Sequence, residues 1–145
     1  MRAGSPLSEV QLLRSERIPN ASFLEENLMG KPVMRWQILA KDPDKAAEFY
    51  TRLFDWQVND DNALGYRMID TGSDRGIHGG IWPSPPEGNS FVQLYIEVDD
   101  VSGSVAKATG MGASIIVPPQ KLPDGDEMAI VLDPEGIPFV VFKSA

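Results

Sequence analysis

Hydrophobic and polar residues alternate along residues 33–40, and this alternation predicts a β-strand with two unlike faces. The more polar face should line solvent or a ligand cavity, and it consists of Arg35, Gln37 and Leu39. The opposite face should lie beneath a helix because it is apolar, and it consists of Met34, Trp36, Ile38 and Ala40.

A helix pattern follows this strand at once. Asp42 is placed to accept hydrogen bonds from the free backbone N–H groups of a first helical turn, and Pro43 has no N–H to lose there. Apolar residues then recur at helical spacing, at Ala46, Phe49, Tyr50, Leu53 and Phe54. We therefore predict a helix that begins at Asp42.

The same order of elements returns later in the chain. Residues 91–98 predict a second strand, and Asp99 or Asp100 caps a helix that Gly110 ends. Residues 33–54 align with residues 91–112 at a constant offset, which places Arg35 on Gln93. Such a repeat indicates two modules of similar structure.

Short strands complete each module and are separated by turns rich in Asn, Asp and Gly. They are predicted at residues 56–58, 66–70, 77–82, 113–117, 127–132 and 137–143. Residues 133–136 carry Asp, Pro and Gly as a type I turn requires, so the last two strands should form a hairpin. The order βαβββ, given twice, predicts an α+β fold in which two tandem modules form a curved mixed sheet around a cup-shaped cavity.

Breaks in composition divide the chain into three parts. Residues 1–31 form an N-terminal extension, residues 32–88 the first module with its Pro-rich linker, and residues 89–145 the second module. We expect the extension to pack over the body or over a partner subunit. We also expect a homodimer, because the first and fifth strands are candidate sheet edges.

Charge and composition narrow the class of partner. The chain of 145 residues has a net charge of −8, which opposes nucleic acid binding because phosphates require positive charge. It has no cysteine, which excludes disulfides and thiolate metal sites. No apolar run approaches the length of a membrane span, and the N-terminus lacks the layout of a signal peptide. These features favour a cytoplasmic protein, and they do not say which small molecule it would bind.

Several short motifs resemble one superfamily. They are Asp42 with the Ala-Ala-Glu-Phe-Tyr run at 46–50, Phe-Asp-Trp at 54–56, Ile-Glu-Val-Asp-Asp at 96–100 and Asp-Pro-Glu-Gly at 133–136. In order and spacing the chain resembles, from about residue 32 to 143, the vicinal oxygen chelate superfamily. This superfamily contains glyoxalase I, bleomycin-resistance proteins, fosfomycin-resistance enzymes and extradiol dioxygenases. The resemblance implies the fold and leaves the activity open.

The resemblance also implies where a metal would be held. Metal-using members place ligands in the first and last strand of each module, and these positions fall here on Arg35, Gly80, Gln93 and Val140. Arginine has no lone pair to give, and glycine and valine have no side-chain donor. Gln93 alone is too little for a transition metal ion, and the chain has one histidine. We therefore expect no metal and no other cofactor.

Strand alternation predicts a cup wall of aromatic and polar side chains. The predicted wall consists of Arg35, Gln37, His78, Trp82, Gln93, Tyr95, Glu97, Val140 and Phe142. Alternatives remain at several positions. Arg35 either binds a ligand or pairs with Glu97, and His78 is either a structural residue or an acid/base. The Gly79–Gly80 pair marks either close approach of a ligand or a β-bulge.

Three functions compete. The favoured one is a metal-free protein that binds a small organic molecule in the cup, as bleomycin-resistance proteins do, with Arg35 anchoring an anionic or strongly polar oxygen. The second is an enzyme, either a metal-dependent lyase or dioxygenase with atypical ligands or a metal-free enzyme that uses His78. The third is an interaction module whose cup is filled by its own side chains.

Overall fold

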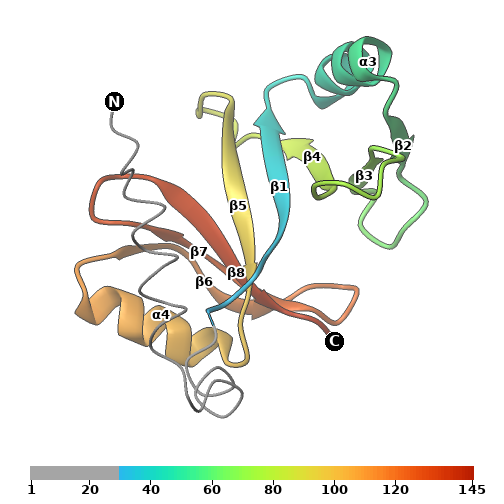
Figure 1. Cartoon of the computed structure of the whole chain (residues 1–145). Helices are drawn as coiled ribbons and strands as arrows, with labels where there is room; N and C mark the ends of the chain where they lie inside the picture. The colour runs from blue at the N-terminus through green and yellow to red at the C-terminus, as the bar shows by residue number, and fades with distance from the viewer. Residues whose placement is uncertain (1–29) are drawn as a thin grey trace, which may run out of the picture. The chain divides into compact units, whose positions relative to one another are not determined.

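The computed structural model describes residues 30–145. Residues 31–145 form a compact unit. This unit contains one eight-stranded sheet and two helices, so its class is α+β as predicted (Figure 1). The expected packing of the N-terminal extension lies outside the described residues.

Both halves of this unit run strand, helix and three strands. The first half consists of β1 (Val33–Ala40), α3 (Pro43–Phe54), β2 (Gln57–Asn59), β3 (Arg67–Asp70) and β4 (Gly79–Pro83). The second half consists of β5 (Phe91–Glu97), α4 (Val101–Gly110), β6 (Ser114–Lys121), β7 (Glu127–Leu132) and β8 (Pro138–Lys143). The strands follow the order β2-β3-β4-β1-β5-β8-β7-β6 in a curved, unclosed sheet.

Strands β1 and β5 lie side by side in the centre of this sheet (Figure 1). They pair antiparallel, with Arg35 opposite Tyr95 and Gln37 opposite Gln93. The expectation that these two strands are sheet edges is wrong. Each is the outer strand of its own half, but the two strands pair with each other, so neither has an edge with unpaired backbone N–H and C=O groups. The edge strands are β2 and β6. The halves therefore join within one chain.

Acidic caps begin both helices. The Asp42 carboxylate accepts from the backbone N–H of Lys45 at 3.1 Å, and Pro43 follows it at the first helical position. The Asp100 carboxylate accepts from the N–H of Gly103 at 3.0 Å and caps α4. Asp99, the alternative cap, instead contacts the Lys31 ammonium at 3.3 Å on the surface.

Each helix covers the same face of its half of the sheet. Ala47 of α3 packs with Ala40, Ile69 and Ile81, and Trp36 and Ile38 lie against this cluster. The apolar face of β1 therefore lies beneath a helix, as its alternation predicted. A matching cluster forms under α4 from Val98, Val101, Val105, Ala129, Val131 and Val141. Burial of these aliphatic side chains is the main stabilising contribution to each half.

Strand β6 is longer than its sequence pattern predicted. It continues from Ser114 through Pro118 and Pro119 to Lys121, with irregular pairing to β7 on either side of Val117. Proline is tolerated here because β6 is an edge strand. A residue whose backbone nitrogen faces away from β7 has no neighbouring strand to donate to, so proline loses no hydrogen bond there. This extension carries Gln120 and Leu122 up to the face opposite the helices.

No helix within residues 30–145 is long and apolar enough to cross a membrane. The cytoplasmic location stays a prediction.

Asp100→Ala should lower the free energy of unfolding by about 1 kcal/mol, because the variant leaves an N–H of the first turn of α4 without its acceptor. Asp99→Ala is the matched control and should change stability little, because its ion pair is exposed. Urea unfolding followed by circular dichroism measures both. Equal losses in the two variants would contradict the assignment of the cap.

Candidate functional site

Two adjoining cavities lie on the face of the sheet opposite the helices. The first, named here the Arg35 pocket, has a volume of about 220 Å³, and its lining includes Arg35, Asn62, Tyr66, Tyr95, Asp124 and Asp126. The second, named the Gln93 pocket, has a volume of about 270 Å³, and its lining includes Gln37, Leu39, Trp82, Gln93, Gln120 and Met128. Both share walls formed by Leu64, Tyr66, Tyr95 and Leu122.

Arg35 is held by aromatic rings. Its guanidinium carbon lies 4.1 Å from the centre of the Tyr95 ring, 5.3 Å from that of Phe142 and 5.8 Å from that of Tyr66. Such contacts attract a cation to the face of each ring. Its Nε atom is buried and has no hydrogen-bond partner among the described residues. The Arg35 pocket therefore contains an unsatisfied N–H donor in its wall.

The alternative ion pair between Arg35 and Glu97 is absent from the described part of the chain. Register explains this, because Arg35 stands opposite Tyr95 on the neighbouring strand, and the tyrosine ring takes the space beside the guanidinium. Glu97 lies at the end of β5, opposite Phe142 of β8, and lines neither cavity.

A chain of hydrogen bonds crosses the floor of the Gln93 pocket. The Gln93 Nε2 atom donates to Gln37 Oε1 at 2.7 Å, and Gln37 Nε2 donates to the Tyr66 hydroxyl at 3.2 Å. Both glutamines are nearly inaccessible, with 6% of Gln37 and 4% of Gln93 exposed. The Gln93 Oε1 atom is buried and accepts no hydrogen bond within residues 30–145. The wall of this pocket therefore includes a side chain with an unsatisfied acceptor.

Tyr66 is the main site residue that the sequence pattern missed. A Cβ atom at Gly80 would overlap the Tyr66 ring, so the glycine is required to let the ring lie over β4. A Cβ at Gly79 would in the same way overlap the Trp36 ring on the helix side. The expected β-bulge is wrong, because β4 pairs with β1 in continuous register through both glycines. Two adjacent glycines in a strand were the signal that large rings approach from both faces.

Asn62 positions Tyr66 from the loop between β2 and β3. Its Oδ1 atom accepts from the Tyr66 N–H at 2.8 Å, and its Nδ2 atom donates to the Tyr66 carbonyl at 2.7 Å. The same Oδ1 atom also accepts from the Leu64 N–H at 3.2 Å. Asparagine is suited to this loop because its side chain can satisfy backbone groups that no strand meets.

The two tyrosines of the shared wall stay protonated at neutral pH. Burial raises the pKa of Tyr66, although the hydrogen bond from Gln37 and the charge of Arg35 oppose the shift. Burial also raises the pKa of Tyr95, although the charge of the same arginine opposes the shift. Each hydroxyl therefore remains a neutral donor and acceptor.

The other predicted wall residues are divided between the cavity and the core. Trp82 lines the Gln93 pocket, with its ring centre 5.6 Å from that of Tyr66. Val140 and Phe142 lie behind the wall, buried in a cluster with Tyr95 and Met128. Phe142 reaches the site only through its contact with the Arg35 guanidinium.

His78 is not brought into either cavity. Strand β4 begins at Gly79 rather than at Ile77, so His78 belongs to the preceding loop, where strand alternation does not apply. Its side chain is exposed; Nδ1 accepts from the Thr71 N–H at 3.1 Å and lies 3.5 Å from an Asp70 carboxylate oxygen. The expectation that it faces the cup is wrong.

The second half supplies walls that the sequence pattern did not predict. They come from β6, β7 and the turn between these strands, and include Val117, Gln120, Leu122, Asp124, Asp126 and Met128. They reach the site because the sheet is curved, and curvature cannot be read from strand alternation.

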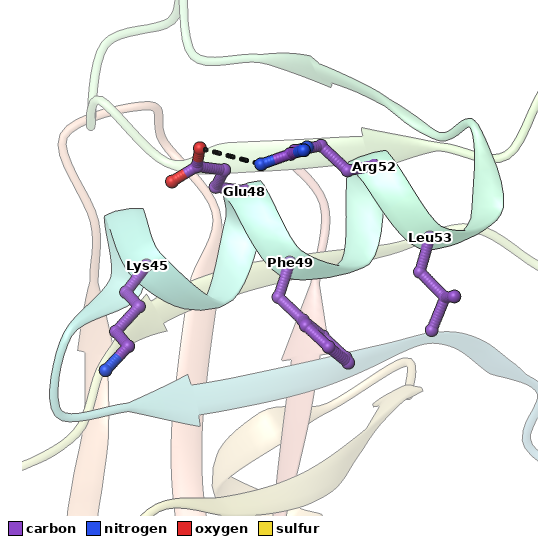
Figure 2. A pocket seen from close by; sticks show the side chains of 5 residues that line it. All are labelled: Lys45, Glu48, Phe49, Arg52 and Leu53. Carbon is purple, nitrogen blue, oxygen red and sulfur yellow. Dashed lines mark ion pairs between the residues drawn. The ribbon is translucent and has the colours of Figure 1, made fainter.

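A third hollow, of about 450 Å³, follows the outer side of α3 and is lined by side chains of that helix alone. Figure 2 shows Lys45, Phe49 and Leu53 projecting from one side of the helix, and Glu48 paired with Arg52 on another. A molecule placed there would contact no polar group of the sheet.

The donor set around the two pockets does not fit a transition metal ion. The positions that the resemblance assigned to metal ligands lie on neighbouring rows of the sheet, with Gly80 beside Gln37 and Val140 beside Tyr95. Val140 is a fully buried aliphatic side chain, and Arg35 presents an N–H donor rather than a lone pair. Within residues 30–145, no three His, Cys, Asp or Glu side chains gather to hold a metal.

Comparison with known proteins gives the family. A model of the Glyoxalase/Bleomycin resistance protein/Dioxygenase superfamily matches residues 33–141, and the chain belongs to this superfamily. It is 30% identical over 112 residues to "Putative glyoxylase CFP32" of Mycobacterium bovis and of Mycobacterium tuberculosis. The match covers 75% of this chain and 42% of each relative, so the chain spans about two-fifths of their length.

Two solved structures illustrate the fold. A glyoxalase/bleomycin resistance protein/dioxygenase superfamily member from Vibrio splendidus 12B01 is 12% identical, with a TM-score of 0.54 over 80% of this chain and 100% of that one. Methylmalonyl-CoA epimerase from Streptomyces coelicolor is 16% identical, with a TM-score of 0.51 over 78% of this chain and 96% of that one. At these identities the likeness establishes the fold.

Tyr66 should make stability depend on pH above 10, its ordinary pKa. Because the folded protein raises this pKa, the stabilising contribution is complete below pH 10 and is lost as the pH rises through the folded-state value. The unfolding free energy should therefore fall less between pH 9 and pH 11 in Tyr66→Phe than in the parent protein. Urea unfolding at the two pH values measures this.

Tyr50→Phe is the control for this measurement, because Tyr50 lies on α3, packs against the rings of Phe49 and Trp56, and lines neither pocket. A Tyr66→Phe protein with the same pH dependence as the parent would contradict the assigned environment of Tyr66.

Proposed function

We propose that this protein is a metal-free member of its superfamily that binds a small organic molecule across the Arg35 and Gln93 pockets. The observation that supports this most is the buried Nε atom of Arg35, which has no partner among the described residues. Leaving a buried donor unpaired costs about 1–3 kcal/mol, and more for a charged group. A ligand oxygen that accepts from Arg35 would remove this cost.

The surrounding side chains define the rest of the ligand. Arg35 anchors an anionic or strongly polar oxygen, because a guanidinium forms charge-assisted hydrogen bonds with carboxylates and similar groups. Tyr95 and Trp82 hold the apolar body of the ligand, and Phe142 supports the guanidinium from behind. Gln93 adds a hydrogen bond. Asp124 and Asp126 line the same pocket, so the attraction for the ligand anion comes from direct contact with the guanidinium rather than from the overall charge of the pocket.

An enzyme is the alternative function. The relative whose name contains "glyoxylase" favours this alternative, and it extends well beyond the aligned part. The donor set described above supports the metal-free proposal instead. A metal-free enzyme that uses His78 has less support, because this side chain points to Thr71 and Asp70. The two open pockets argue against an interaction module with a filled cup.

Arg35→Met should weaken binding of an anionic aromatic molecule by about 1.5–3 kcal/mol, as expected for loss of a hydrogen bond between charged groups. A panel of aromatic carboxylates, titrated calorimetrically, would supply the tightest probe for the comparison. Arg52→Met is the matched control, because Arg52 lies exposed on α3 and lines neither pocket. Unchanged affinity in a folded Arg35→Met protein would exclude the anchor.

Purified protein should contain no stoichiometric transition metal, and adding Zn²⁺ or Ni²⁺ should not raise the melting temperature. The reason is that a metal which binds the native state must stabilise it by mass action. Elemental analysis and thermal unfolding measure the two quantities. Tight one-to-one binding of metal in the pockets would overturn the proposal and favour the metal-dependent enzyme.

We also propose a homodimer. Large apolar side chains remain exposed on α3 and on the helix side of β5, and association would remove them from water; they include Phe49, Leu53, Val92 and Leu94. Light scattering at micromolar concentration should give a mass near twice the 15.9 kDa of one chain. A mass near 15.9 kDa would contradict this proposal.

A further inference from the structure

The free end of the Gln93 amide in this structure is its oxygen. The Gln93 nitrogen donates to Gln37, and the Gln37 nitrogen donates in turn to the Tyr66 hydroxyl, so the Gln93 oxygen is directed away from this chain of hydrogen bonds. That oxygen is buried without a donor among the described residues, on a side chain that is 4% exposed and lines the Gln93 pocket. A buried acceptor of this kind favours a ligand N–H or O–H.

Arg35 and Gln93 therefore present opposite hydrogen-bonding demands. The Arg35 Nε atom needs an acceptor and the Gln93 Oε1 atom needs a donor. From these demands we infer that the ligand is a small aromatic hydroxy acid, or its N–H counterpart, with an anionic oxygen at one end and an O–H or N–H at the other. This inference rests on the proposed binding function and names the class of ligand.

The sheet register sets the distance between the two groups. Arg35 stands opposite Tyr95, and Gln93 lies two residues from Tyr95 on the same face of β5. Diagonal neighbours of this kind are about 7–8 Å apart at the backbone. A single aromatic ring with its two polar groups at opposite positions suits this spacing. The rings of Tyr66 and Tyr95, which belong to both pockets, would flank it.

Hydrogen bonding opposes a second anionic group on the ligand, because a second carboxylate would direct acceptors at the Gln93 oxygen. Asp124 and Asp126 line the Arg35 pocket and already offset the charge of its guanidinium, so a dianion would meet more repulsion than a monoanion. The ligand should therefore be a monoanion whose second polar group is a neutral donor. In this way 4-hydroxybenzoate fits the two pockets, whereas terephthalate, with a carboxylate in place of the hydroxyl, does not.

Calorimetric titration of the parent protein with matched probes tests this inference without any substitution. We expect 4-hydroxybenzoate to bind about tenfold or more tightly than 4-methoxybenzoate, because methylation removes the donor, and terephthalate to bind more weakly than both. Equal affinities for the hydroxy and methoxy compounds would overturn the inference, and so would a preference for terephthalate. Failure of all three probes to bind would exclude this ligand class.

Gln93→Met identifies the acceptor. Methionine keeps a similar volume and lacks the amide oxygen, so the preference for 4-hydroxybenzoate over 4-methoxybenzoate should disappear in this variant. Gln57→Met is the control, because Gln57 is exposed on β2 and lines neither pocket. Retention of the preference in Gln93→Met would overturn the role of Gln93.

The outcomes separate this inference from the proposed function. A molecule without a donor that binds the parent tightly and loses affinity in Arg35→Met would support the proposed function and overturn the inferred ligand class. Tight metal binding in the pockets would overturn the proposed function itself.

Discussion

Strands β1 and β5 join the two halves of the sheet by antiparallel pairing, and the candidate site depends on the register of this pairing. The register sets Arg35 opposite Tyr95 and Gln37 opposite Gln93, so a cation, a ring and two amides share one small area of the face opposite the helices. A slip of one residue would turn these side chains toward the helices and bring apolar side chains to the cavity. The apolar clusters under α3 and α4 oppose such a slip, because it would expose Ala40 and Val98 and their neighbours.

Tyr66 reaches this area because Gly80 leaves space for its ring. At a position where the family resemblance places a metal ligand, the chain therefore presents a buried phenol, which is joined by hydrogen bonds to Gln37 and Gln93. The result is a polar centre made of neutral amides, a protonated tyrosine and one arginine. It leaves a donor at one end and an acceptor at the other without partners in the described residues, and such groups are costly in a protein interior unless something binds them.

Sequence patterns predicted the architecture well because it depends on local signals. The alternation along β1, the caps at Asp42 and Asp100 and the turn at Asp133 are each written in a few adjacent residues. Part of the predicted cup wall lines the two pockets, namely Arg35, Gln37, Trp82, Gln93 and Tyr95. His78 was placed wrongly because β4 begins one residue after it. Tyr66 and the walls from β6 and β7 were missed because loop geometry and sheet curvature bring them there, and neither has a periodic signal.

The central claim is that the two pockets form an open, metal-free site in which Arg35 and Gln93 have free polar atoms. A high-resolution crystal structure of the purified protein, with anomalous data, tests it most directly. The account predicts density for an organic molecule or for ordered water beside Arg35 Nε and Gln93 Oε1, and no anomalous peak there. A metal ion bound to the Gln93 oxygen, or pockets filled by the protein's own side chains, would contradict it.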